Sequence, residues 1–108
     1  MVSQKKSIRE LDELKAVDIA KVADGIYRGN YDTVLVKVTL EAIVENHKLM
    51  DIKIIRHENG KSKKAEAIVK QMIAENSTEA DVIAGATMSS KVIRAALIDA
   101  LKEGIEQK

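Results

Sequence analysis

The alternation of apolar and polar residues is clearest between Thr33 and Val44. Lys37, Thr39 and Glu41 occupy one set of alternate positions, with Leu35 and Ile43 as apolar exceptions; the other set is Val34, Val36, Val38, Leu40, Ala42 and Val44. Alternation of this length, rich in β-branched residues, predicts a half-buried strand of an antiparallel sheet.

A second strand is expected directly after this one. Glu45-Asn46-His47-Lys48 interrupts the alternation, and Asn tolerates the left-handed backbone of a tight turn, so the sequence predicts a hairpin here. The returning strand runs from Leu49 to His57. Its apolar face is predicted to carry Met50, Ile52 and Ile54, with Asp51 and Lys53 on the other side.

Two helices follow the hairpin in the predicted order. After Asn59-Gly60, the first runs from about Ser62 to Glu75, with an apolar stripe formed by Ala65, Ile68, Val69, Met72 and Ile73. The second runs from about Ser89 to Glu103, and Gly104 stands where a C-terminal cap is expected. Its buried face is predicted to be Ile93, Ala96, Leu97, Ala100 and Leu101.

This order of elements predicts an α+β fold, in which an antiparallel, hairpin-based sheet carries helices on one face. A length of 108 residues fits a single domain, which we place at residues 20–108. Residues 1–19 are expected to form a leader, either a short helix or a loosely packed segment. Ser7 and Glu10 have the spacing of a capping box at its start.

Composition narrows the classes of function. The chain has 18 Lys and Arg against 17 Asp and Glu, so it lacks the basic excess of a nucleic-acid-binding domain. It has no Cys, which excludes disulfides, Cys–zinc sites and Cys nucleophiles. No apolar run approaches the ~20 residues of a transmembrane helix, so the sequence predicts a soluble domain. Both the cytoplasm and the extracytoplasmic side of a membrane remain open as its location.

The candidate chemistry lies between the two helices, from Asp81 to Ser90. Gly85 permits unusual backbone angles, and Ala84 and Ala86 leave room for a ligand beside the main chain. Hydroxyl side chains surround the start of the second helix at Thr87, Ser89 and Ser90, and Lys91 adds a positive charge. A helix start supplies unpaired N–H groups and a partial positive charge, so this segment suits a phosphate group.

A simpler interpretation of the same residues stays open at this point. Thr87 or Ser89 could serve only as the N-cap of the second helix, and Gly85 only as a turn residue, because such caps are common at helix starts.

The segment Asp81-x-x-Ala84-Gly85-Ala86-Thr87-x-Ser89-Ser90 resembles the signature of the FMN-binding domain family, which includes flavin-carrying redox subunits of the NqrC and RnfG type. A second family element, Asp-Gly-x-Tyr-x-Gly, is similar to the residues from Asp24 to Gly29. Both motifs occur in the family's order, with a hairpin and a helix between them. The resemblance covers roughly residues 20–103.

The resemblance implies that the chain binds FMN and carries electrons, as a redox component rather than a self-sufficient enzyme. Its partners would be a redox protein or a membrane electron-transfer complex. The position of Thr87 is the one that can carry FMN through a phosphoester bond made by a flavin transferase, so covalent and non-covalent binding both remain open. Ala84 departs from the family pattern, which has Ser there.

Single residues complete the expected site. Tyr27 could lie against the flavin ring or simply pack on the sheet, and Asp81 could orient the loop, bind a divalent ion or form a turn. Met88 could touch the ring or belong to the core. Tyr31 is expected at the surface or a strand edge. His47 and His57 are expected at the surface, too far apart along the second strand to share a metal.

Two other functions compete with the flavin carrier. One is a binding or interaction module that keeps the fold without a flavin. The other is a dimer formed through the helical stripe from Ile93 to Leu101.

Overall fold

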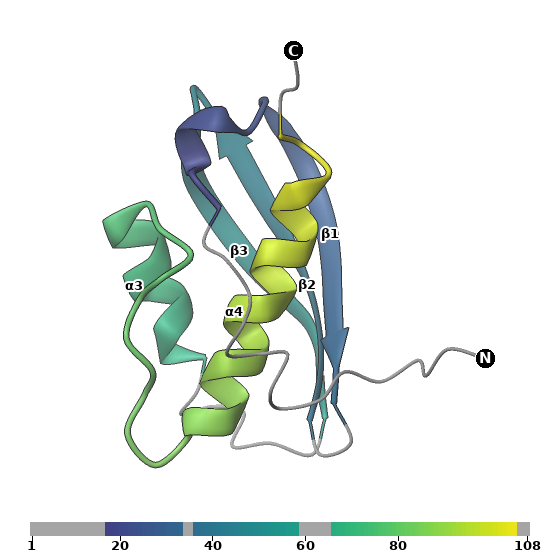
Figure 1. Cartoon of the computed structure of the whole chain (residues 1–108), viewed down its shortest axis with the longest axis vertical. Helices are drawn as coiled ribbons and strands as arrows, with labels where there is room; N and C mark the ends of the chain where they lie inside the picture. The colour runs from purple at the N-terminus through teal and green to yellow at the C-terminus, as the bar shows by residue number, and fades with distance from the viewer. Residues whose placement is uncertain (1–16, 34–35, 59–65, 106–108) are drawn as a thin grey trace, which may run out of the picture.

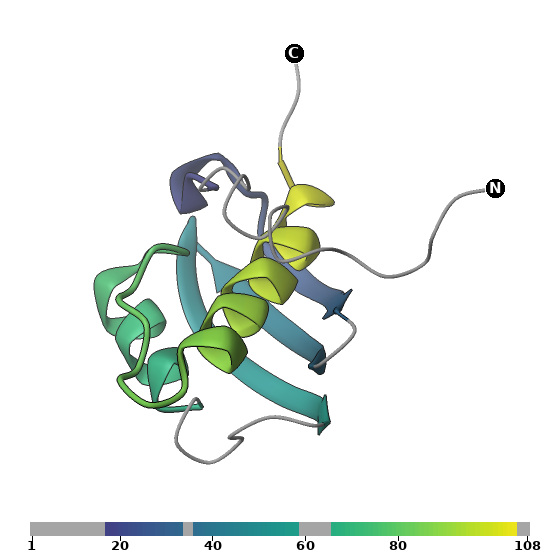
Figure 2. The ribbon, with the colours of Figure 1, turned by 60° about the horizontal axis from the view of Figure 1, so that its bottom comes forward.

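The fold is built on a three-stranded antiparallel sheet in the order β1-β2-β3. The strands are β1 (Gly25–Asp32), β2 (Lys37–Glu45) and β3 (Lys48–Glu58). The computed structural model describes residues 17–33, 36–58 and 66–105. The helices α3 (Ala67–Glu75) and α4 (Thr87–Lys102) cover the same face of the sheet (Figures 1 and 2). The predicted α+β class is therefore confirmed.

The central strand β2 follows the predicted alternation. Its inward-facing side chains are fully buried, namely Val38, Leu40, Ala42 and Val44. The strand starts at Lys37 rather than at Thr33, and the predicted positions Val34 and Leu35 lie outside the described residues. The Thr33 N–H donates to the Val36 carbonyl oxygen at 2.8 Å, and the Val36 N–H donates to the Thr33 hydroxyl at 2.9 Å.

The hairpin between β2 and β3 is confirmed. Asn46 and His47 both have positive φ angles, 54° and 60°, between the paired residues Glu45 and Lys48. Positive φ at both central residues is the geometry of a type I′ turn, which matches the twist of the flanking strands.

Two β-bulges overturn part of the prediction for β3. Val44 pairs with Leu49 and Ile43 with Asp51, so Met50 is an extra residue and its side chain is 50% exposed instead of buried. The second register shift falls at Ile55, since Leu40 pairs with Ile54 and Thr39 with Arg56. Each extra residue reverses which alternate positions face inward.

The first strand, β1, is the element that the hydrophobic pattern did not predict. Its sequence Gly-Ile-Tyr-Arg-Gly-Asn-Tyr-Asp has no apolar alternation, and its inward positions include Gly29 and Tyr31. A side chain at Gly29 would collide with the backbone of Ala96 and Ala100, so this glycine lets α4 pack closely across the sheet. Tyr31 pairs with Val38 on β1, which is an edge strand of the sheet, and it is only 6% exposed; of the two expected positions, the strand edge is therefore confirmed and the surface is wrong.

The helices bury the predicted faces within the described residues, and Ala65 of the predicted stripe lies outside them. In α4, all five predicted core residues are buried: Ile93, Ala96, Leu97, Ala100 and Leu101. In α3, Ile68 and Met72 are fully buried, and Val69 and Ile73 pack against the core from partly exposed positions. α4 begins at Thr87, earlier than predicted. Neither of the α-helices that the structure describes has the length and apolar character of a membrane-spanning segment.

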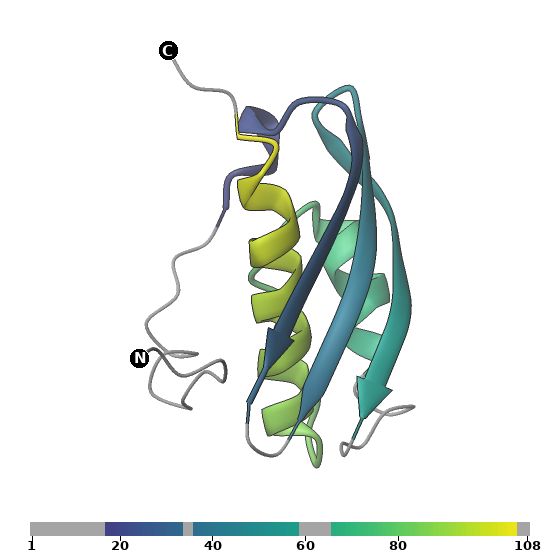
Figure 3. The same cartoon turned by 90° about the vertical axis from the view of Figure 1, so that its right-hand side faces the viewer.

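The two ends of the described chain meet beyond the C-terminal end of α4 (Figure 3). The predicted leader lies mostly outside the described residues; the part that is described contains a short 3-10 helix, η1 (Ile19–Lys21). Val22 forms an antiparallel bridge with Ile105, and the Ala23 N–H donates to the Gly104 carbonyl oxygen at 2.8 Å. This junction closes the end of the core that lies opposite the start of α4.

Candidate functional site: the turn before α4

A tight turn leads the chain into α4. The Ala86 N–H donates to the Ile83 carbonyl oxygen at 2.9 Å, and Gly85, at the third position of the turn, has a φ of 81°. This positive φ is the one that the third position of a type II turn requires, and glycine adopts it without a steric penalty. Gly85 is exposed, so the backbone of the turn is open to a ligand.

The hydroxyl of Ser90 holds this turn against the first turn of the helix. It accepts a hydrogen bond from the Ile83 N–H at 3.0 Å and donates one to the Ala86 carbonyl oxygen at 2.8 Å. The Ser90 side chain is fully buried, and Ser89 is buried as well. Of the three hydroxyls predicted to surround the helix start, only that of Thr87 lies on an exposed residue. The Ser90 hydroxyl therefore holds the loop in position, and its expected role in cofactor binding stays a prediction.

The start of α4 carries no side-chain cap. Its N-cap residue is Ala86, so neither Thr87 nor Ser89 is the capping residue, and the simpler interpretation of these hydroxyls is wrong. The first N–H groups of a helix have no partner within the helix, and here no acidic residue stands in the first turn to compete for them. The helix is 16 residues long, which gives its start a partial positive charge.

The donors at this helix start fit a phosphate group. Backbone N–H groups, the exposed Gly85 turn and the exposed Thr87 hydroxyl lie together where the helix field attracts an anion. Lys91 follows Thr87 by one helical turn, which places the two residues on the same side of α4.

Other predicted residues lie around this turn with different exposure. Asp81 is exposed on the loop, and Met88 is partly buried and packs against the core. Within residues 17–33, 36–58 and 66–105, no three acidic or histidine side chains gather in a way that could hold a metal ion. Arg94 donates to Glu79 at 3.1 Å and so ties α4 to the loop that precedes it.

Tyr27 lies at the opposite end of α4 from Thr87. Its hydroxyl donates to the Ala23 carbonyl oxygen at 2.6 Å, and its ring lies so close to Gly104 that a side chain there would collide with it. A 16-residue helix is about 24 Å long, so the structure does not bring Tyr27 together with Thr87. Glycine is needed at position 104 for this close contact with the Tyr27 ring. Gly104 does not form the predicted left-handed cap, because among the described glycines only Gly25 and Gly85 have a positive φ angle.

A buried histidine lies next to a carboxylate, which the sequence pattern did not predict. The His57 side chain is 2% exposed, and its Nδ1 lies 3.4 Å from Oε2 of Glu66, at the start of α3. The expected surface position was wrong because the bulge at Ile55 turns His57 toward the helices, opposite the buried Val38. His47 is exposed as expected.

The chain therefore folds as a small α+β domain. The start of its helix α4 is suited to an anion. The chain matches the family model of the FMN-binding domain over residues 29–102, more than half of its 108 residues, and it belongs to that family. A comparison with curated proteins found no match.

Membership in this family confirms the resemblance seen in the sequence and gives FMN as the cofactor. The matched residues include the Gly-Ala-Thr segment and both strands of the hairpin. They begin at Gly29, so most of the Asp-Gly-x-Tyr-x-Gly element stands outside the match.

Proposed function

We propose that this chain is a flavin electron carrier that holds the phosphate of FMN at the turn before α4. The observation that carries this proposal is the uncapped helix start beside an exposed glycine turn, in a chain of the FMN-binding domain family. The N–H groups of the first turn of α4 and the hydroxyl of Thr87 would bind the phosphate oxygens. The cofactor, when bound, supplies the redox chemistry.

The surrounding structure supports a rigid phosphate site. Ser90 fixes the turn from within, and the ion pair between Arg94 and Glu79 fixes the loop from outside. A ligand group that binds here therefore meets donors that are already in place, and little conformational entropy is lost on binding.

The exposed hydroxyl of Thr87 suits two modes of attachment. In the first, it donates a hydrogen bond to a non-covalently bound phosphate. In the second, its oxygen attacks the flavin phosphorus of a flavin nucleotide that is activated as a pyrophosphate, with a flavin transferase as catalyst. The new O–P bond to Thr87 forms, the pyrophosphate P–O bond breaks, the other nucleoside monophosphate leaves, and the hydroxyl proton is released. The electron donor and acceptor would be a redox protein or a membrane electron-transfer complex.

The visible spectrum of the purified protein tests this proposal. No side chain of this chain absorbs visible light, so absorbance in the visible region would come from a bound flavin. After acid precipitation, flavin in the pellet indicates covalent attachment and flavin in the supernatant indicates non-covalent binding. The bound flavin should bleach on reduction and recover fully when an electron acceptor is added. A protein that takes up no flavin even from excess FMN would instead be a flavin-free module.

A further inference from the structure

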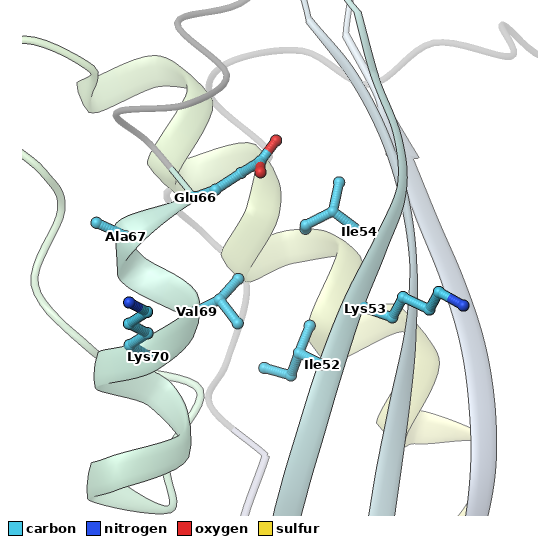
Figure 4. Close-up of a pocket in the computed structure, with 7 residues that line it drawn as sticks. All are labelled: Ile52, Lys53, Ile54, Glu66, Ala67, Val69 and Lys70. Atoms are coloured by element: carbon cyan, nitrogen blue, oxygen red, sulfur yellow. The ribbon is translucent and has the colours of Figure 1, made fainter.

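The helix α3 stands apart from the neighbouring strand over its first turns. An open cleft of about 540 Å³ lies between β3 and α3, and Figure 4 shows the side chains of Ile52 and Val69 pointing toward one another across it. Within α3, Ile68 and Met72 are the buried residues. The helix therefore packs along a narrow stripe, and the loop that follows it needs contacts of its own to stay in place.

The loop after α3 is anchored at its beginning and leads directly to the phosphate site (Figure 1). Asn76 ends α3 with a φ of 52°, and its side-chain oxygen accepts a hydrogen bond from the Leu49 N–H at 2.6 Å. Ala80 is fully buried. Residues 81–85 alone separate this anchored part from Ala86, the N-cap residue of α4. So short a segment passes a displacement of the anchor on to the turn before α4.

Thr78 joins this loop to the residue just before η1. Its hydroxyl accepts a hydrogen bond from the Val17 N–H at 3.2 Å, although the two residues are 61 positions apart in the sequence. The same hydroxyl donates to Oε2 of Glu79 at 3.2 Å. Thr78 and Val17 are both buried, so water does not compete for this contact and its loss would leave a buried N–H without a partner.

Glu79 carries the connection on to α4. Its Oε1 accepts a hydrogen bond from Arg94 at 3.1 Å, and Arg94 lies about two helical turns after Thr87. A continuous set of polar contacts therefore runs from Val17 through Thr78 and Glu79 to the helix whose start forms the phosphate site. We call these contacts the polar relay.

We propose that Thr78 is a positioning residue of the phosphate site and that docking of Val17 on Thr78 and binding of FMN strengthen each other. With the polar relay formed, the loop lies against α4 and the donors from Gly85 to Thr87 are already in place. Without it, part of the binding free energy is spent on ordering the loop. Such a coupling acts equally in both directions. The inference rests on the proposed phosphate site.

Amide exchange in the unmodified chain tests this coupling without any substitution. The Val17 N–H is released when its bond to Thr78 opens, so saturating FMN should slow its exchange with solvent at least about fivefold. The Ala23 N–H, which bonds to the Gly104 carbonyl oxygen at the opposite end of α4, is the control and should slow less. FMN that binds without slowing the Val17 exchange, or that slows both amides equally, overturns the coupling.

Substitution of Thr78 separates a positioning role from a purely structural one. Thr78→Val removes the hydroxyl with little change of shape and should lower FMN affinity at least about fivefold, whereas riboflavin, which lacks the phosphate, should lose less than about twofold. Thr78→Ser keeps a hydroxyl and should restore the FMN affinity. Losses of FMN and riboflavin affinity in the same proportion would make Thr78 a structural residue only and overturn the proposal.

Thr39→Val is the matched control for this substitution. Thr39 lies between the buried residues Val38 and Leu40 on β2, so its side chain is on the face of the sheet that carries no helix. It should bind FMN and riboflavin as the unmodified chain does, and an FMN loss equal to that of Thr78→Val would contradict the assignment. Circular dichroism checks that each variant is folded, and the exchange measurement decides if Thr78→Val is not.

A double substitution tests whether the hydroxyl and the carboxylate act as one unit. Glu79→Ala removes the acceptor for both Thr78 and Arg94 and should also lower FMN affinity. Because both residues belong to the polar relay, Thr78→Val combined with Glu79→Ala should weaken FMN binding by less than the product of the two single effects. A double variant that shows the full product would overturn the relay.

The coupling and the phosphate site fail in different ways. If the unmodified chain binds FMN and riboflavin equally, the proposed phosphate site fails and the coupling fails with it. If the unmodified chain prefers FMN and Thr78→Val keeps that preference in full, the phosphate site stands and the coupling alone is overturned.

Discussion

The hydroxyl of Ser90 donates a hydrogen bond to the carbonyl oxygen of Ala86, 2.8 Å away, and thereby joins the first turn of α4 to the residue at its N-cap. The same hydroxyl accepts from the Ile83 N–H, so one buried side chain determines the shape of the turn through Gly85. The sequence predicted that the Ser90 hydroxyl contacts the cofactor. In the structure this hydroxyl supports the turn that forms the site.

Ser90→Ala should destabilise the fold and weaken FMN binding together. Removing the hydroxyl leaves the Ile83 N–H without its partner, at a cost of about 1–3 kcal/mol. Urea unfolding measures the loss of stability, and fluorescence titration measures FMN affinity. Ser90→Ala with full stability and full affinity would contradict the positioning role.

Thr87→Val should change flavin binding and leave stability nearly unchanged. Thr87 is exposed, so the free energy of unfolding should stay within about 0.5 kcal/mol of the original value. Free FMN should bind about fivefold more weakly, as expected for one lost hydrogen bond, and covalent attachment should be abolished. Thr87→Ser, which keeps a hydroxyl, is the control and should retain both. Unchanged binding in Thr87→Val would show that its hydroxyl does not contact the phosphate.

Gly85→Ala should strain the turn before α4. Its φ of 81° costs a residue with a Cβ about 1–2 kcal/mol, and relief of this strain would move the N–H groups of the helix start. Gly85→Asn should cost less because Asn tolerates the left-handed region. Thermal unfolding and FMN titration should show a higher melting temperature and a higher FMN affinity for Gly85→Asn than for Gly85→Ala. The reverse order would refute the role assigned to the backbone of Gly85.

Gly29→Ala should separate α4 from the sheet. The added methyl group would meet the backbone of Ala96 and Ala100, which cannot rotate away, so we expect a loss of about 1–3 kcal/mol. The neighbouring exposed Asn30→Ala is the control and should stay within about 0.5 kcal/mol of the original. Similar unfolding free energies for the two variants would argue against close packing at Gly29.

The hydrophobic pattern predicted the elements whose burial is regular. In β2, every second residue from Val38 to Val44 is buried, and in α4 the stripe from Ile93 to Leu101 faces the sheet. Neither segment is interrupted. The buried positions therefore recur every two residues in β2 and about once per helical turn in α4.

The facing of side chains on β3 and the position of β1 could not be predicted from the hydrophobic pattern, because both depend on contacts with neighbouring elements. The bulges at Met50 and Ile55 depend on the pairing with β2, and they alone decide that Met50 is exposed and His57 buried. β1 pairs with β2 along its whole length and admits α4 closely at Gly29, and neither interaction requires an apolar alternation in its sequence. The motif around Gly85 located the helix start, but the sequence did not show which of its hydroxyls are buried.

Binding of FMN and of riboflavin to the flavin-free protein tests the phosphate site most directly. The two ligands share the ring and the ribityl chain and differ only in the phosphate. We expect FMN to bind at least about tenfold more tightly, with a preference that falls as salt is added and is lost in part on competition with inorganic phosphate. Equal dissociation constants for FMN and riboflavin would contradict a phosphate site at the start of α4.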